Sequence, residues 1–121
     1  MEINQNVVIQ KCIAGTQAEF QGDHQKAHQL YLEAWELAQT DYEFCVAAHY
    51  VARHQEDPNE KFRWNQIALN KANQANVDEV REFFPSLYLN MGQSYELLGN
   101  KAEAEKYYKL AADLGLPHQM K

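Results

Sequence analysis

The sequence predicts an all-α protein built from three helical hairpins. Small and aromatic residues recur three and four positions apart, the spacing that places side chains on one face of a helix. Glycines and N-capping residues separate the stretches that carry this pattern. The alternation of apolar and polar residues that marks a strand does not extend over a useful length.

The stretch 85–117 contains the clearest hairpin. Tyr88, Met91, Gly92 and Tyr95 share one face of its first helix. A mid-helix glycine costs about 1 kcal/mol relative to alanine. Gly92 therefore indicates a second helix packed too closely to leave room for a side chain.

The second helix of this hairpin has clear boundaries. Gly99 suits the left-handed residue that ends the first helix, and Asn100 with Glu103 forms a capping box for the second. Gly115 and Pro117 stop that helix.

An earlier copy of the same unit lies in residues 5–39, with helices expected over 5–21 and 24–39. Five residues of this first hairpin recur 77 positions later in the same order, which establishes an internal repeat. The pairs are Gly15 and Gly92, Gly22 and Gly99, Ala27 and Ala104, Tyr31 and Tyr108, and Ala34 and Ala111.

The middle hairpin is more divergent. Thr40 caps a helix over 41–55, and Asp57 caps the helix that follows. We place Trp64 at the position of Tyr31 and Tyr108, which gives steps of 33 and 44 residues between successive hairpins.

The ten additional residues of the second step lie at 75–84. Asn76 with Glu79 forms a further capping box, which predicts an N-terminal extension of the fifth helix. Pro85 must kink or break that extension, because proline removes a helical hydrogen bond.

The order of an aromatic residue, Gly92, Tyr95, Ala104, Tyr108 and Pro117 resembles the tetratricopeptide repeat family. The resemblance implies a right-handed superhelix of three antiparallel hairpins with a lengthened third repeat. It also implies one domain over residues 1–121, with repeats at about 8–40, 41–74 and 85–117 and the extension at 75–84.

Composition and charge argue against several classes of partner. The 121 residues carry a net charge of −6, which argues against a nucleic-acid partner. No run of 18 apolar residues and no signal-peptide pattern is present, and the two cysteines suit a reducing compartment. We expect a cytoplasmic protein with no membrane partner and no cofactor.

The resemblance further implies a concave groove that binds a protein or peptide without catalysis. The slots that grip a terminal carboxylate in chaperone-binding members contain no basic residue here, so we do not expect that ligand. The residues carried over to the groove are Glu19, Phe20, Tyr42, Cys45, His49, Arg53, Ser86, Leu89, Gln93 and Glu96.

Two alternatives concern histidines. Cys45, His49 and Arg53 are spaced four apart, so a small-ligand sensor or an enzyme centred on them is the second interpretation. His24 and His28 have metal-compatible spacing, but no third ligand accompanies them, and we expect them on a solvated face.

The last helix carries a second apolar stripe formed by Tyr107, Leu110 and Leu114. A repeat array needs a polar face on its terminal unit. We therefore predict that this stripe is buried in a two-fold homodimer, although the partner helix of the same hairpin could also cover part of it.

Overall fold

The computed structural model describes residues 6–116, and all regular structure in that range is helical. The elements are α1 (Val7–Phe20), α2 (His24–Leu37), α3 (Asp41–Arg53), α4 (Pro58–Gln74), the one-turn helix α5 (Val77–Val80), the 3-10 turn η2 (Arg81–Phe83), α6 (Phe84–Leu97) and α7 (Lys101–Asp113). The stop expected at Pro117 and the helix start expected at residue 5 lie outside the described residues.

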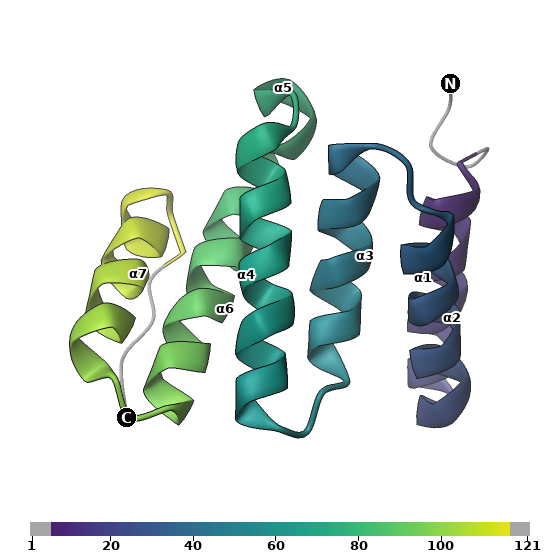
Figure 1. Cartoon of the computed structure of the whole chain (residues 1–121), viewed down its shortest axis with the longest axis horizontal. Helices are drawn as coiled ribbons and strands as arrows, with labels where there is room; N and C mark the ends of the chain where they lie inside the picture. Colours follow the sequence, from purple (N-terminus) through teal and green to yellow (C-terminus); the bar gives the residue numbers. More distant parts are fainter. Residues whose placement is uncertain (1–5, 117–121) are drawn as a thin grey trace.

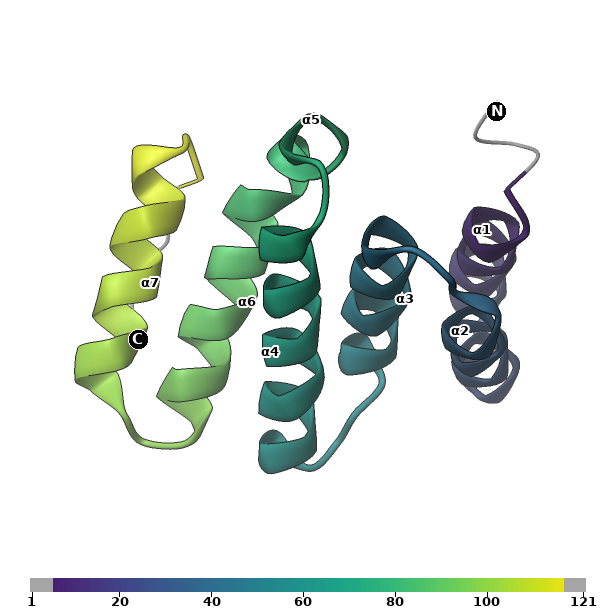
Figure 2. The same ribbon diagram turned by 45° about the horizontal axis from the view of Figure 1, so that its top comes forward.

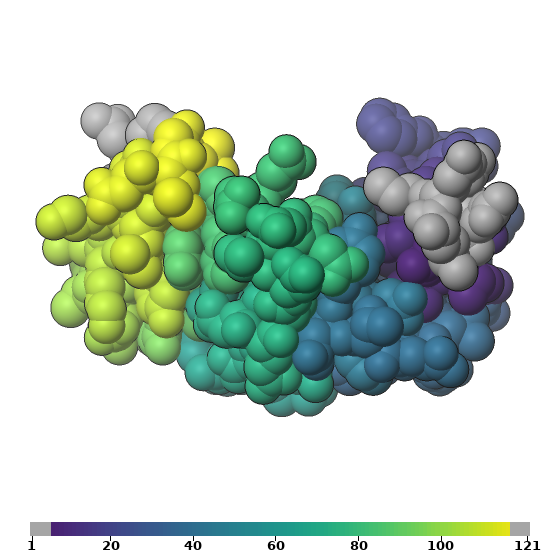
Figure 3. All heavy atoms as spheres, turned by 90° about the horizontal axis from the view of Figure 1, so that it is seen from above, coloured from purple at the N-terminus to yellow at the C-terminus, as the bar shows by residue number. Residues whose placement is uncertain are grey.

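Consecutive long helices pack as three hairpins, α1 with α2, α3 with α4, and α6 with α7. Figures 1 and 2 show these hairpins side by side in one row that follows the order of the sequence. In Figure 3 the purple and yellow ends rise on the same side while the teal middle bulges to the other, so the row is bowed. The all-α fold predicted from the sequence is confirmed.

Each outer hairpin closes around one glycine and one tyrosine. A Cβ added to Gly15 would lie 2.3 Å from Cε1 of Tyr31, and one added to Gly92 would lie 2.6 Å from Cδ1 of Tyr108. No side chain fits at either glycine unless the ring moves, because protein interiors are close-packed. The close approach expected at Gly92 is therefore confirmed.

Side-chain caps set where the helices begin. Asn6 caps α1, and its Oδ1 accepts hydrogen bonds from the backbone N–H groups of Val8 at 2.9 Å and Ile9 at 3.2 Å. This cap was not predicted from the sequence, and α1 begins at Val7. The caps predicted from the sequence each accept a backbone N–H, namely Thr40, Asp57, Asn76 and Asn100, and Asp23 caps α2 in the same way.

The positions of these caps correct the alignment of the middle hairpin. Asp57 caps α4 and lies 34 residues after Asp23, which caps α2. Asn100 caps α7 and lies 43 residues after Asp57. The steps of 33 and 44 expected from the sequence were each wrong by one residue.

The corrected step places Asn65, rather than Trp64, at the position of Tyr31 and Tyr108. Trp64 points instead toward the first hairpin, where its ring meets that of Trp35 edge-on with centroids 5.0 Å apart and an interplanar angle of 88°. The two tryptophans thus form part of the junction between the first and second hairpins.

The segment before α6 forms a break in the helix and not a continuous extension. Val80, which ends α5 and is fully buried, has φ −112° and ψ −3°, and the 3-10 turn η2 follows it. Pro85 lies in the first turn of α6, where a missing N–H leaves no helical hydrogen bond unmade. In Figure 1 this segment crosses the top of the molecule between α4 and α6.

Between residues 6 and 116, no helix combines the length and the apolar character that a membrane span requires.

Candidate functional site

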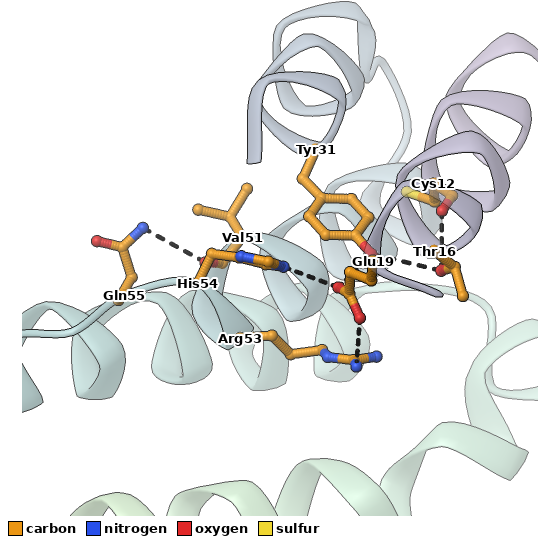
Figure 4. A network of polar contacts seen from close by, with 8 residues as sticks. All are labelled: Cys12, Thr16, Glu19, Tyr31, Val51, Arg53, His54 and Gln55. Atoms are coloured by element: carbon orange, nitrogen blue, oxygen red, sulfur yellow. Dashed lines mark hydrogen bonds and ion pairs between the residues drawn. The ribbon is translucent and has the colours of Figure 1, made fainter. Parts of the chain in front are cut away.

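The carboxylate of Glu19, near the end of α1, is the centre of a polar network shown in Figure 4. It accepts a hydrogen bond from the Tyr31 hydroxyl at 2.6 Å and from the Arg53 guanidinium at 2.8 Å, and it lies 2.8 Å from Nε2 of His54. Tyr31 belongs to α2, whereas Arg53 and His54 end α3. Glu19 therefore joins the first hairpin to the second.

The electrostatics of this network keep Glu19 ionised. Partial burial by itself raises the pKa of Glu19, but the hydrogen bonds from Tyr31 and His54 and the charge of Arg53 outweigh burial, so the pKa is lowered. Burial and the bond to Glu19 raise the pKa of Tyr31. The Glu19 side chain is only 15% exposed, whereas that of Arg53 is 47% exposed.

The third hairpin repeats the tyrosine and carboxylate pair. The Tyr108 hydroxyl donates to Oε1 of Glu96 at 2.6 Å, the same distance as in the first hairpin. Each of these two residues lies 77 positions after its counterpart. Within residues 6–116 no helix follows α7, and no cation pairs with Glu96.

The middle hairpin has different residues at the equivalent positions. His49 replaces the glycine, and Asn65 replaces the tyrosine. The buried Asn65 donates through Nδ2 to Oγ of the buried Ser94 at 2.9 Å. Nδ2 of Asn90 lies 3.2 Å from Nδ1 of His49. Burial, and then the charge of Arg53, lower the pKa of His49 to about 4, so this imidazole is neutral at neutral pH.

A cleft of about 680 Å³ opens between the second and third hairpins. At the first junction α3 packs on both α2 and α1, whereas at the second junction α6 packs on α4 and hardly touches α3. In addition, Asn65 is smaller than the tyrosine found at its position in the other hairpins, and these two differences leave space beside α3. The lining residues are Ala52, Arg53, Lys61, Asn65, Asn90, Gln93, Ser94, Glu96, Leu97 and Tyr108.

The structure places the ten residues predicted to line the groove in different environments. Arg53, Gln93 and Glu96 line the cleft. Phe20 is 88% exposed, whereas Cys45 is only 1% exposed, so the Cys45 side chain belongs to the core and not to a binding surface. The other five are partly buried: Glu19, Tyr42, His49, Ser86 and Leu89.

The environment of Cys45 does not favour thiol chemistry. Burial raises its pKa to about 12, so the thiol is protonated at neutral pH. The neighbouring His49 is a neutral base whose Nδ1 faces Asn90. Arg53 is already paired with Glu19. The three residues of the second interpretation therefore take part in packing and in the junction between hairpins.

The histidines of α2 lie close to His54. The rings of His24 and His28 each have their centroid 6.1 Å from that of His54. His24 is exposed, but His28 is partly buried, and its Nδ1 is shielded from water without a hydrogen-bond partner. Across residues 6–116, no three His, Cys, Asp or Glu side chains form a group that could hold a metal ion.

The cleft residues that the predicted groove omitted include Lys61, Asn65 and Tyr108. All three belong to the second helix of their hairpins, whereas the expected groove used only first helices. The cap at Asp57 was the available signal, because counting from it places Asn65 at the tyrosine position.

Comparison with known proteins identifies one part of the chain. A family model described as a tetratricopeptide repeat matches residues 85–114, which span α6 and α7. No curated protein and no solved structure matches the chain. The resemblance inferred from the order of residues in this hairpin is confirmed.

Proposed function

We propose that this chain, which contains a tetratricopeptide repeat at residues 85–114, is a non-enzymatic scaffold that binds a peptide segment of another protein. Stacked repeats of this kind present extended concave surfaces used for binding. In this proposal the three hairpins act as one domain over residues 1–121. The observation that carries it is the cleft between the second and third hairpins.

The cleft offers groups suited to a peptide. Gln93 presents an amide that pairs with backbone N–H and C=O groups, Asn90 adds an amide oxygen beside the nitrogen that faces His49, and the half-exposed Arg53 adds charge. Leu97 is 61% exposed and gives apolar contact area. Phe20, Tyr42 and Leu89 extend the proposed groove toward both ends of the row, with His49 and Glu96 setting the register of the bound segment.

A selection from a random peptide library, displayed on phage, tests this function. We expect enrichment of peptides that bind the wild-type chain and that bind the Arg53→Ala and Gln93→Trp variants more weakly. Gln66→Trp is the matched control, because Gln66 is exposed on α4 and does not line the cleft. Failure to enrich any peptide, or equal binding by the variants, would overturn the proposal.

We also propose self-association as a two-fold dimer through the outer face of α7. Leu110 is 37% exposed and Leu114 is 53% exposed. Tyr107 contributes less, because its ring stacks on that of Tyr95 at 5.7 Å. Light scattering after size exclusion tests this, and Leu110→Glu with Leu114→Glu should give monomers. A monomeric mass of the wild-type chain at every concentration would exclude the dimer.

We also propose a cytoplasmic location. Its support is that Cys12 and Cys45 are both free and buried. Labelling of the unfolded chain from cell extract with a thiol reagent tests it, since a protein from an oxidising compartment would show blocked cysteines.

A further inference from the structure

The first hairpin shows what a carboxylate held by a tyrosine binds in this molecule. Glu19 is fixed by Tyr31 and receives the guanidinium of Arg53 from the next hairpin at 2.8 Å. Figure 4 shows Glu19 between the two, with Arg53 on the side away from the tyrosine ring. The tyrosine therefore orients the carboxylate, and the arginine forms an ion pair with it.

The third hairpin contains the hydrogen-bonded tyrosine and glutamate but not the arginine. Glu96 accepts from Tyr108 at 2.6 Å through Oε1. Among the described residues no arginine, lysine or histidine lies within ion-pair distance of Glu96. Its side chain is partly exposed and lines the cleft beside Gln93 and Leu97. A cation can thus reach Glu96 from outside the molecule.

A second copy of this chain stacked as a further repeat does not supply that cation. If a copy stacked on α6 and α7 as a further repeat, its α1 would take the place that α3 takes against the first hairpin. The residue of α1 at the position of Arg53, 34 residues earlier, is Glu19. Such stacking would bring two carboxylates together, which is unfavourable.

We propose that Glu96, oriented by Tyr108, binds the guanidinium of an arginine on the partner segment. This inference rests on the proposed peptide-binding function and specifies its chemistry. A guanidinium presents a planar pair of N–H donors that fits a carboxylate, and its aliphatic stem packs on apolar surface such as Leu97. The net charge of −6 on the chain also favours a basic partner.

The other charges of the cleft define the competing occupant. Arg53 is already paired with Glu19. Lys61 has no ion pair within the described part of the chain, and alone it would attract an acidic segment. An acidic occupant depends on Lys61, whereas a basic occupant depends on Glu96, so single substitutions separate the two.

Nuclear magnetic resonance titration of the full chain tests the proposal. The probes are acetyl-arginine amide, its neutral isostere acetyl-citrulline amide, and acetyl-glutamate amide. We expect the arginine probe to shift the amide resonances around Gln93 and Glu96 and to bind roughly two- to fivefold more tightly than citrulline, as for an exposed ion pair. Glu96→Gln should remove this preference, and Glu105→Gln, an exposed control on α7, should keep it.

Three results of this titration would overturn the proposal. The arginine and citrulline probes could bind equally, the preference could survive Glu96→Gln, or the glutamate probe could bind more tightly and lose its binding in Lys61→Gln. The comparison of the two probes on the wild-type chain does not depend on how any variant folds. Peptides selected from the library that lack arginine would also contradict this inference while leaving the peptide-binding function intact.

Discussion

The first and third hairpins are built from the same local parts and end in different surroundings. Both pack a tyrosine ring against a helical glycine, and both tyrosines donate to a glutamate at 2.6 Å. In the first hairpin that glutamate is enclosed by Arg53, the last residue of α3, and by His54, which follows it. In the third hairpin, Glu96 lines an open cleft.

This difference shows that one side-chain pair can serve two purposes in a repeat protein. Between two hairpins the carboxylate connects them, because the next hairpin supplies the cations that pair with it. At the end of the described row the same carboxylate is an accessible acceptor. Position in the row, rather than local sequence, decides which of the two it is.

The largest effect is expected from the glycines that both hairpins share. Gly15→Leu and Gly92→Leu must displace the rings of Tyr31 and Tyr108, and overpacking of this kind typically costs about 1–3 kcal/mol. Urea denaturation followed by circular dichroism measures the loss. Ala102→Leu, at an exposed position of α7, is the control and should be nearly neutral. Wild-type stability of either glycine variant would show that its hairpin is more loosely packed than described.

Removal of the tyrosine hydroxyls should lower the free energy of unfolding by different amounts in the two hairpins. Tyr31→Phe deprives the enclosed Glu19 of a partner and should cost about 1.5–3 kcal/mol, the range for hydrogen bonds to charged groups. Tyr108→Phe should cost about half as much, because water can replace the hydroxyl at Glu96. Equal losses in chemical denaturation would contradict the view that only the first pair is enclosed.

The middle hairpin should show a pH dependence of its own. The pKa of His49 falls from 6.5 to about 4 on folding, so between these values the unfolded chain binds a proton that the folded chain does not. Acidification through this window therefore destabilises the fold, by at most about 1.4 kcal/mol per pH unit. The lowered pKa of Glu19 acts below its ordinary value of 4.5, so the two effects are distinguishable.

His49→Gln should flatten the stability profile between pH 6.5 and 4.5. His24→Gln, at an exposed position, is the matched control and should leave the profile steep. Parallel profiles for the wild-type chain and His49→Gln, measured by thermal denaturation, would mean that His49 is protonated in the folded chain.

The smallest effect is expected from the cation that distinguishes the first hairpin. Arg53→Ala should lower stability by less than about 1 kcal/mol, because its side chain is 47% exposed and Glu19 retains Tyr31 and His54. The loss should shrink further at high salt. Arg63→Ala, which removes a pair within one helix, provides the comparison. A loss of several kcal/mol for Arg53→Ala would mean that the whole network depends on the arginine.

Sequence alone predicted the parts of the fold that depend on local chemistry. Gly99 has φ +84° and ends α6 as its lack of a side chain suggests, and Asn100 caps α7. The 77-residue spacing also predicted that Gly15 and Gly92 occupy equivalent positions in their hairpins, and each packs against a tyrosine ring. These features follow from backbone geometry and close packing, which leave few residue choices.

The candidate site was less predictable because it arises between hairpins. Asn65 and His49 differ so much from tyrosine and glycine that their shared positions emerged only from the cap at Asp57. The cleft depends on α6 packing on α4 rather than on α3, which no local pattern encodes. The ion pair of Glu19 with Arg53 spans 34 residues, one hairpin step, and that spacing was the signal available for it.

The contact between Trp35 and Trp64 has a consequence for optical experiments. These are the two tryptophans of the chain, and both lie at the junction between the first and second hairpins. Their emission therefore reports on that junction, while the third hairpin contains tyrosines and Phe84 but no tryptophan. Because stacked hairpins contact only their neighbours, unfolding of the C-terminal hairpin should change tryptophan fluorescence less than loss of that junction does. A melting curve recorded by this signal alone would describe mainly the N-terminal part of the molecule.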